Sequence, residues 1–323
     1  MSDLKPVRWG ILGAARFAIN TMGPAINAAR GAEIAAVATS SPEKAAQIRA
    51  FATGARHVES YEALIADPEI DAVYVPLPNH LHVEWSIRAL EAGKAVLCEK
   101  PIAMREADFD ALIAARDRAG LLASEAFMIA HHPQWARVRD WLAEGRIGAL
   151  RQVNAIFTYD NPDMGNFRNH ADFGGGGLRD IGVYTFGATR LATGAEPRGL
   201  VHARTVRENG VDTFATDVFD FGGFELHSMV STRMERRQEM QFHGSRGMIR
   251  VNCPFNPIDF AAAELELIVG DEAMRVEHFP KVNQYVAQVE RFGAAMRGEA
   301  DWPWPLERSR GTQAMIDAAL AAG

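Results

Sequence analysis

The chain has 323 residues, of which 48% are hydrophobic and 23% are charged, and its formal net charge is -7. This length allows two domains with full cores, and the composition is that of an ordinary globular protein. The negative charge argues against a nucleic-acid or anionic-membrane partner. The two cysteines, Cys98 and Cys253, have neither zinc nor disulfide spacing, and no apolar leader or membrane-length stretch occurs. We therefore expect a cytoplasmic protein.

An apolar strand runs into a glycine turn near the N-terminus. The strand is expected at Val7–Leu12, the turn at Gly13 and a helix at Ala18–Ala29. This order brings backbone N–H groups and a helix N-terminus to a dinucleotide pyrophosphate. The match to Gly-x-Gly-x-x-Gly is imperfect, with alanine in the second and third places, and an ordinary strand-helix turn is the alternative. The candidate cofactor-binding residues here are Gly13, Ala15, Arg16 and Phe17.

Strands and helices alternate through the first 125 residues. Strands are expected at 7–12, 33–38, 58, 72–75, 95–98 and 121–123, and helices at 18–29, 42–51, 61–66, 82–92 and 105–119. This alternation implies a parallel, doubly wound α/β sheet. Ligands bind at the carboxyl ends of such strands, so Gly13, Pro76–Asn79 and Glu99–Pro101 should converge on one crevice.

The pattern changes after about residue 150. Period-two or β-rich segments occur at 151–159, 200–207, 216–221, 226–233, 239–244, 248–252 and 265–269, with helical segments at 134–144 and 180–193. This pattern predicts an open, mainly antiparallel sheet in an α+β domain. The expected division is a dinucleotide-binding domain at 1–125 and a substrate-binding and oligomerisation domain at 126–323, whose last helix is a candidate to pack back on the first domain.

Two segments carry candidate catalytic groups. Lys100 follows a buried strand, where its ammonium could stabilise a developing alkoxide; the alternative is an exposed lysine paired with Glu99. The run Gly174–Tyr184 contains four glycines, which let a backbone approach a ligand closely, and then Asp180 and Tyr184 one helical turn apart. A tyrosine can exchange a proton with a substrate hydroxyl. The plainer interpretations are an N-cap for Asp180 and core packing for Tyr184.

Several motifs occur together in one order. They are Pro-Leu-Pro-Asn-His-Leu-His82, Ala-Gly-Lys-Ala-Val-Leu-Cys-Glu-Lys-Pro101, Glu125-Ala-Phe-Met, His132-Pro-Gln134 and Gly-Gly-Gly-Gly-Leu-Arg-Asp-Ile-Gly-Val-Tyr184. With the glycine turn, they resemble the glucose–fructose oxidoreductase / inositol dehydrogenase / rhizopine-catabolism (Gfo/Idh/MocA) family over nearly the whole chain.

The resemblance implies an N-terminal Rossmann domain, a C-terminal α/β domain with an open sheet, and a homodimer or homotetramer built through that sheet. It also implies hydride transfer between a sugar or polyol carbon and NAD(P). Lys100 and Tyr184 match the family's catalytic positions, and Asp180 matches the acidic residue that helps hold the substrate. Tyrosine in place of histidine resembles the aldose and dihydrodiol dehydrogenases of the family.

Other residues are expected around these groups. Phe127 and Arg168 are candidates to contact substrate, although a surface ion pair would also explain Arg168. The cofactor candidates that follow the fourth and fifth strands are Pro76, Leu77, Asn79, His82, Glu99 and Lys100. Packing, or capping of the next helix, is the favoured role for His82. His131 and His132 have no further ligand set, so no metal is expected.

The end of the second strand bears on the choice of cofactor. NAD sites usually place an acid there, whereas this chain has Thr39, Ser40 and Ser41, which can donate hydrogen bonds to a 2′-phosphate. Arg16 or Lys44 could add positive charge, although the usual arginine after the strand is absent. We expect NADP, with NAD as the alternative.

The expected activity is NADP-dependent oxidation or reduction of a sugar or polyol, with the anomeric carbon of an aldose favoured. One alternative is a dihydrodiol dehydrogenase or another non-sugar carbonyl reductase, because Phe127, Met128, Ile129 and Phe173 would give an apolar pocket. The other is a non-catalytic dinucleotide sensor, because fold alone does not imply activity.

Overall fold

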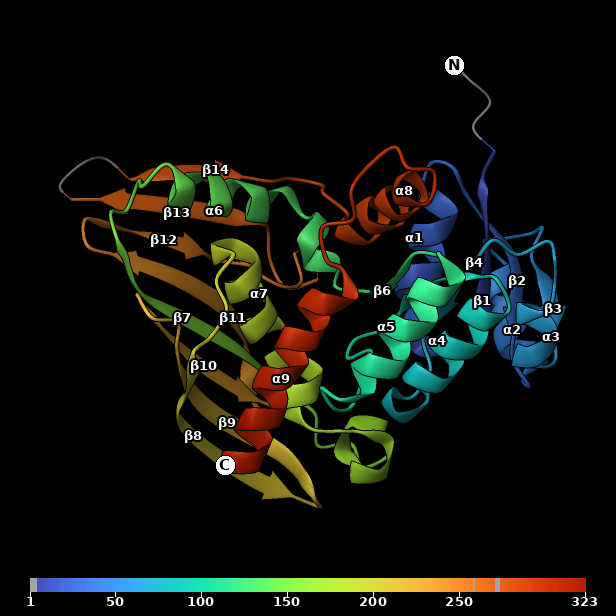
Figure 1. Ribbon diagram of the computed structural model, residues 1–323, viewed down its shortest axis with the longest axis horizontal. Helices are drawn as coiled ribbons and strands as arrows, with labels where there is room; N and C mark the ends of the chain where they lie inside the picture. The colour runs from blue at the N-terminus through green and yellow to red at the C-terminus, as the bar shows by residue number, and fades with distance from the viewer. Residues whose placement is uncertain (1–4, 258, 271–273) are drawn as a thin grey trace. The chain divides into compact units, whose positions relative to one another are not determined.

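The computed structural model describes residues 5–257, 259–270 and 274–323 (Figure 1). The chain forms two compact units. The first, called the N-terminal unit here, comprises Met1–His131 and Asn283–Arg310; the second, the C-terminal unit, comprises His132–Val282 and Gly311–Gly323. Among the described residues, no helix has both the length and the hydropathy to cross a bilayer.

A six-stranded parallel sheet forms the centre of the N-terminal unit, in the order β3-β2-β1-β4-β5-β6. The strands are β1 (Val7–Leu12), β2 (Ala32–Ala38), β3 (Arg56–Val58), β4 (Ala72–Val75), β5 (Ala95–Cys98) and β6 (Ala123–Glu125). The order runs outward on both sides from β1, which confirms the doubly wound α/β prediction. β6 starts later than expected, because Ala123 and Glu125 pair with Val96 and Cys98. The acidic residue Glu125 interrupts the apolar run of this buried strand, so a search for hydrophobic periodicity does not detect the end of the strand.

Helices connect these strands. They are η1 (Ala18–Met22), α1 (Gly23–Ala28), α2 (Pro42–Arg49), α3 (Tyr61–Ile65), η2 (Asn79–Leu81), α4 (His82–Glu91), α5 (Asp108–Ala119), η3 (Met128–His131) and α8 (Gln284–Met296). The first predicted helix therefore begins with a π-helical segment, η1. α5 begins at Asp108 rather than Arg105. α8 was not predicted. It packs on α1 and η3, and the ring of its residue Phe292 lies 5.1 Å from the ring of Trp9 in β1.

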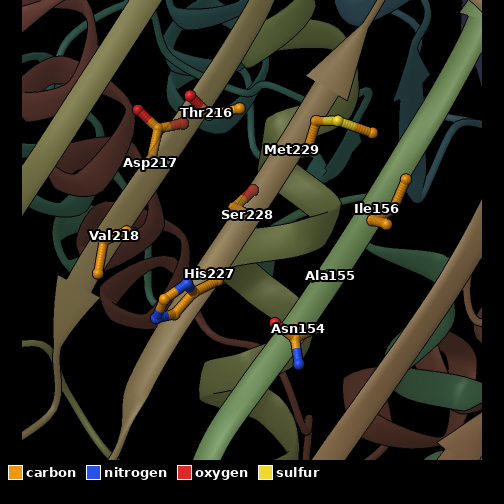
Figure 2. Close-up of a pocket in the computed structure, with 9 residues that line it drawn as sticks. All are labelled: Asn154, Ala155, Ile156, Thr216, Asp217, Val218, His227, Ser228 and Met229. Atoms are coloured by element: carbon orange, nitrogen blue, oxygen red, sulfur yellow. The ribbon is translucent and has the colours of Figure 1, made fainter.

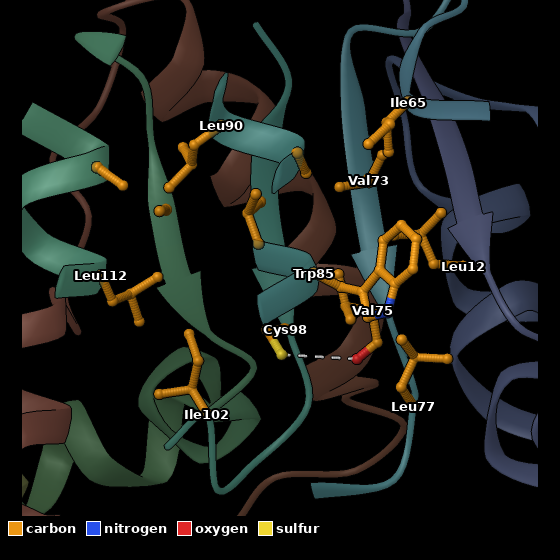
Figure 3. Close-up of a cluster of buried hydrophobic side chains, with 14 of the residues drawn as sticks. Leu12, Ile65, Val73, Val75, Leu77, Trp85, Leu90, Cys98, Ile102 and Leu112 are labelled. Atoms are coloured by element: carbon orange, nitrogen blue, oxygen red, sulfur yellow. Dashed lines mark hydrogen bonds between the residues drawn. The ribbon is translucent and has the colours of Figure 1, made fainter. Parts of the chain in front are cut away.

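The core of this unit lies where α4 and α5 cover the sheet (Figure 3). All residues of β4 and β5 are buried, as expected for strands covered on both faces. Trp85 and Leu112 reach into this cluster from the two helices, toward Val75 and Ile102. Truncating a side chain such as Leu112 to alanine is expected to cost about 2–5 kcal/mol of stability. This core holds the strand ends, and with them the loops that carry the candidate site.

An eight-stranded sheet dominates the C-terminal unit, in the order β14-β13-β12-β11-β7-β10-β9-β8. The strands are β7 (Leu150–Asp160), β8 (Gly199–Glu208), β9 (Val211–Asp220), β10 (Glu225–Ser231), β11 (Arg233–Gly244), β12 (Gly247–Val251), β13 (Glu264–Val269) and β14 (Arg275–His278). The mainly antiparallel prediction is confirmed. β10 and β7 nevertheless pair in parallel, and β14 was not predicted.

One face of this sheet is covered by α7 (Val183–Thr193), where Ser228 donates to Thr185 at 2.8 Å. The other elements of the unit are α6 (Pro133–Ala143), η4 (Phe167–Asn169), η5 (Ala171–Phe173) and η6 (Leu178–Gly182). α9 (Leu306–Ala322) begins in the segment of the N-terminal unit and ends in that of the C-terminal unit. Side chains alternate along β7, β9 and β10, so every second residue faces away from α7.

Candidate functional site

The turn after β1 has the geometry of a pyrophosphate cradle. Gly13 has φ +97°, and its N–H donates to the carbonyl of Ala38 at 2.8 Å. A Cβ at this position would lie 3.0 Å from Leu77 Cδ2, so a glycine is required. Arg16 and Phe17 are exposed, and the Phe17 ring packs edge-on against Tyr285 at 5.7 Å. The first N–H groups of a helix have no partner within the helix, so this turn fits a bound pyrophosphate.

The loop after β2 contains one exposed serine and two hydroxyls that already form hydrogen bonds within the protein. Thr39 is buried, and its Oγ1 accepts from the N–H of Ser41 at 3.2 Å. Ser41 caps α2: its Oγ accepts from the N–H of Lys44 at 3.2 Å and donates to the Glu43 carboxylate at 2.8 Å. Ser40 is exposed. Glu43 was not a candidate from the sequence. Its negative charge lies beside the predicted 2′-phosphate donors.

The loops after β4 and β5 lie side by side, because Val75 pairs with Cys98 in the parallel ladder. In the second loop, Glu99 accepts a hydrogen bond from the Tyr74 hydroxyl at 2.7 Å, and Lys100 is half-buried before a cis peptide bond to Pro101. In the first loop, Asn79 is buried at the start of η2. The structure thus brings the turn after β1 and these two loops to neighbouring strand ends.

His82 is fully buried at the start of α4. Its Nδ1 lies 2.8 Å from the carbonyl of Pro101, and its Nε2 lies 2.7 Å from the carbonyl of Leu77. Burial lowers the pKa of His82 to about 4, against the opposing effect of these two carbonyls. The ring therefore interacts with the protein backbone on both sides.

Asp180 is the centre of a polar cluster in the C-terminal unit. Its Oδ1 accepts from Arg168 Nε at 2.9 Å, and its Oδ2 accepts from the Tyr159 hydroxyl at 2.5 Å. Asp180 lies inside the π-helical segment η6, so it is not an N-cap. The charge of Asp180 raises the pKa of Arg168, while burial and the same carboxylate raise the pKa of Tyr159. The cluster therefore holds a carboxylate, a guanidinium and a neutral phenol.

The glycines before this segment serve protein packing. A Cβ at Gly175 would lie 2.2 Å from the carbonyl oxygen of Arg168, and one at Gly176 would lie 2.1 Å from Asp212 Oδ1. Gly176 also has φ +117°. Both glycines thus approach other parts of the protein closely, namely the backbone of Arg168 and the side chain of Asp212. The glycines thus place Arg168 next to Asp180.

Tyr184 begins the first turn of α7, one turn after Asp180. Its ring lies 5.8 Å from Phe157 and 5.7 Å from Phe255, which stack on each other at 4.9 Å. The side chain is 5% exposed, and its electrostatic effect reaches Arg168. Tyr184 therefore packs among buried aromatic side chains and lies one helical turn from the carboxylate–guanidinium pair.

The remaining candidates belong to different units. Phe127, in the N-terminal unit, is fully buried and stacks on Trp304 at 4.5 Å, whereas Phe173, in the C-terminal unit, is 42% exposed. Sequence reasoning missed Tyr74, Tyr159 and Glu125. The aromatic pattern of β7 includes Tyr159, but no sequence signal relates it to Asp180. In the described part of the chain, no three His, Cys, Asp or Glu side chains are grouped to hold a metal ion.

A depression of about 230 Å³ lies over β7, β10 and β9 (Figure 2). It is lined by Asn154, Ala155, Ile156, Thr216, Asp217, Val218, His227, Ser228 and Met229. None of these residues was a sequence candidate. The lining residues that alternate away from α7 include Ile156, Val218 and Met229, which gives this face of the sheet an apolar character.

Comparison with known proteins identifies both parts of the chain. Residues 7–127 match an oxidoreductase family with an NAD-binding Rossmann fold, and residues 135–250 match the GFO/IDH/MocA C-terminal domain. A dTDP-3,4-didehydro-2,6-dideoxy-alpha-D-glucose 3-reductase from Actinomadura kijaniata is 35% identical, covering 98% of this chain and 96% of the relative. A D-xylose 1-dehydrogenase (NADP(+)) from Haloferax volcanii is 32% identical, covering 89% of this chain and 88% of the relative.

Solved structures agree with this result. The crystal structure of a 3-ketoreductase from Actinomadura kijaniata in complex with NADP and TDP-benzene has a TM-score of 0.90 and 33% identity, over 98% of both chains. A likeness of this extent, found in both parts of the sequence, shows that the chain belongs to the Gfo/Idh/MocA family of NAD(P)-dependent oxidoreductases.

Proposed function

We propose that the protein transfers a hydride between NADP and a carbinol or carbonyl carbon of a sugar or related polyol, with the anomeric carbon of an aldose as the first substrate class. The observation that carries this proposal is the cluster around Asp180. A carboxylate held by Arg168 and Tyr159 lies one helical turn from Tyr184. Charged groups of this kind can form hydrogen bonds with sugar hydroxyls.

Each residue has a separate role in this proposal. Tyr184 acts as general acid and base on the reacting hydroxyl. Lys100 stabilises developing negative charge on that oxygen and lowers the barrier to proton transfer by Tyr184. Asp180 and Arg168 bind neighbouring hydroxyls. The nicotinamide, when bound, supplies or accepts the hydride.

NADP is the proposed cofactor. Gly13, Ala15, Arg16 and Phe17 would hold the pyrophosphate, and Pro76, Leu77, Asn79 and Glu99 would line the path toward the nicotinamide. Ser40 and the cations Arg16 and Lys44 would meet the 2′-phosphate, with Thr39 and Ser41 shaping the loop. The names of two relatives support this choice, since one is an NADP(+) enzyme and another was crystallised with NADP.

A second candidate is reduction of a keto-sugar carried on a nucleotide. It is favoured by the relative that reduces a dTDP-linked keto-sugar, which is 35% identical over nearly the whole chain. The roles of Lys100 and Tyr184 are the same in both reactions; the direction, the reacting carbon and the nucleotide attached to the sugar differ.

We also propose that copies of the chain associate as a homodimer or homotetramer through the face of the eight-stranded sheet that points away from α7. Half-buried apolar side chains on that face, Ile156, Val218 and Met229, support this proposal. Sedimentation of the wild type and of Met229→Asp would test it, because a charge in an apolar contact should favour the monomer.

The decisive experiment follows the reduced cofactor by absorbance. Wild type and Lys100→Ala are assayed with NADP and NAD against aldoses, inositols, aromatic dihydrodiols and, in the reverse direction, nucleotide-linked keto-sugars. Turnover of an aldose that prefers NADP and requires Lys100 supports the proposal. Turnover restricted to dihydrodiols or keto-sugars assigns one of the alternatives. NADPH binding without turnover of any compound would overturn the catalytic proposal in favour of a sensor.

A further inference from the structure

The peptide unit that joins Pro101 to Ile102, next after Lys100-Pro101, is held at both ends by buried ionisable side chains. Its carbonyl oxygen lies 2.8 Å from His82 Nδ1, and its N–H donates to Glu125 Oε1 at 3.1 Å. Pro101 and Ile102 are themselves buried. Breaking either hydrogen bond would leave a polar group unpaired inside the protein, so this stretch of backbone is tightly constrained.

His82 connects this peptide to a second loop. Its other ring nitrogen lies 2.7 Å from the carbonyl of Leu77, in the loop after β4. A protonated ring donates to both carbonyls, whereas a neutral ring donates to one. In either state the ring lies against one carbonyl of the loop after β4 and one carbonyl of the loop after β5.

Glu125 holds the same peptide from the side of β6. Its carboxylate is 3% exposed, and its second oxygen accepts from the Ser309 hydroxyl at 3.0 Å. Burial raises the pKa of Glu125, while its hydrogen bonds and the charge of Lys100 oppose that rise. A buried carboxylate therefore lies within electrostatic reach of Lys100 and is also bonded to the backbone two residues beyond it.

We propose that Glu125 and His82 are positioning residues for Lys100: together they hold the Pro101–Ile102 peptide, which follows the lysine directly in the chain. The proposal rests on the catalytic role proposed above for Lys100. Neither Glu125 nor His82 touches substrate in this scheme, and both act through the lysine.

The test is a double-mutant cycle. Glu125→Gln and His82→Gln are each made in the wild type and in Lys100→Ala, with Ser309→Ala as the matched control that removes only the other partner of Glu125. In the wild type we expect kcat to fall by about a hundredfold for Glu125→Gln, since a small misplacement of a catalytic group has effects of that size. The KM and the dissociation constant of NADPH should stay within about threefold. In Lys100→Ala the same substitutions should change kcat no further.

Additive losses in the two backgrounds, or a loss of NADPH binding equal to the loss of kcat, would overturn the proposal. Full turnover by Lys100→Ala would instead overturn the catalytic role of Lys100, which is a different failure.

Discussion

The two units of the chain present their candidate chemistry in different ways. In the N-terminal unit, Gly13, Asn79 and Lys100 lie in loops that follow parallel strands, so their order in the chain predicts their meeting place. In the C-terminal unit, Asp180 lies on a π-helical segment, and its partners Arg168 and Tyr159 lie 12 and 21 residues away, on the short helix η4 and on β7. The first arrangement is a property of the fold class, and the second depends on individual packing contacts.

The largest effect is expected at Tyr184, where the cluster of the C-terminal unit would act on substrate. Tyr184→Phe keeps the packed aromatic ring and removes the hydroxyl, so turnover should fall about a hundred- to ten-thousandfold while NADPH affinity stays the same. Steady-state kinetics and a fluorescence titration with NADPH measure the two quantities. Wild-type turnover by this variant would show that the proton passes through another group.

The next effect concerns Asp217, a buried acid opposite Ser228 on the strand pair β9–β10. Neither carboxylate oxygen accepts a hydrogen bond from a described residue. Burial, and then the charge of Asp212, raise its pKa from 3.8 to about 7. The folded state therefore holds a proton that the unfolded state releases, and the stabilising effect of that proton is complete below about pH 4 and is lost as the pH rises toward 7.

Asp217→Asn should remove this dependence. The stability of the wild type relative to Asp217→Asn should fall by about 1.4 kcal/mol per pH unit between pH 4 and pH 7. Urea unfolding at several pH values measures this difference, with the exposed Asp301→Asn as a matched control. A constant difference across that range would mean that Asp217 is ionised in the folded protein.

A smaller effect is expected at Arg168, whose side chain is 34% exposed. Arg168→Lys keeps a positive charge near Asp180 but loses the planar fork that binds two oxygens at once. We expect the KM for the sugar to rise about tenfold with little change in kcat, which is the pattern of lost ground-state binding. A fall in kcat at constant KM would instead place Arg168 in the chemical step.

The smallest effect tests the loop after β2 in the N-terminal unit. Glu43→Gln removes a negative charge that is bonded to the Ser41 hydroxyl. Because the group is exposed, NADP should bind only about two- to threefold more tightly, with NAD affinity unchanged. Calorimetric titration with both cofactors checks this, and an equal change for NAD and NADP would move the 2′-phosphate away from this loop.

The sequence predicted the parallel sheet well because most of its strands are short apolar runs that alternate with helical segments. It could not predict η1 and η6, since a π-helical turn differs from an α-helical turn by one residue of hydrogen bonding and leaves no pattern of its own. It also could not place Tyr159 beside Asp180. The neighbouring contact between Arg168 and Asp180 was no more predictable: the segment of Arg168 lies so close to Gly175 that a Cβ there would be 2.2 Å from the Arg168 carbonyl oxygen, which is a question of space and not of periodicity.

The return of residues 283–310 to the N-terminal unit has a consequence for the order in which the chain is completed during synthesis. Ser309 bonds Glu125, Glu307 forms an ion pair with Arg116, and Trp304 stacks on Phe127. The other elements of this unit have been synthesised once the chain reaches residue 131. These contacts can form only after the intervening residues of the C-terminal unit have been synthesised as well. The dinucleotide-binding part of the protein is thus begun first and finished nearly last, and Phe127 and Glu125 lack these partners in the meantime.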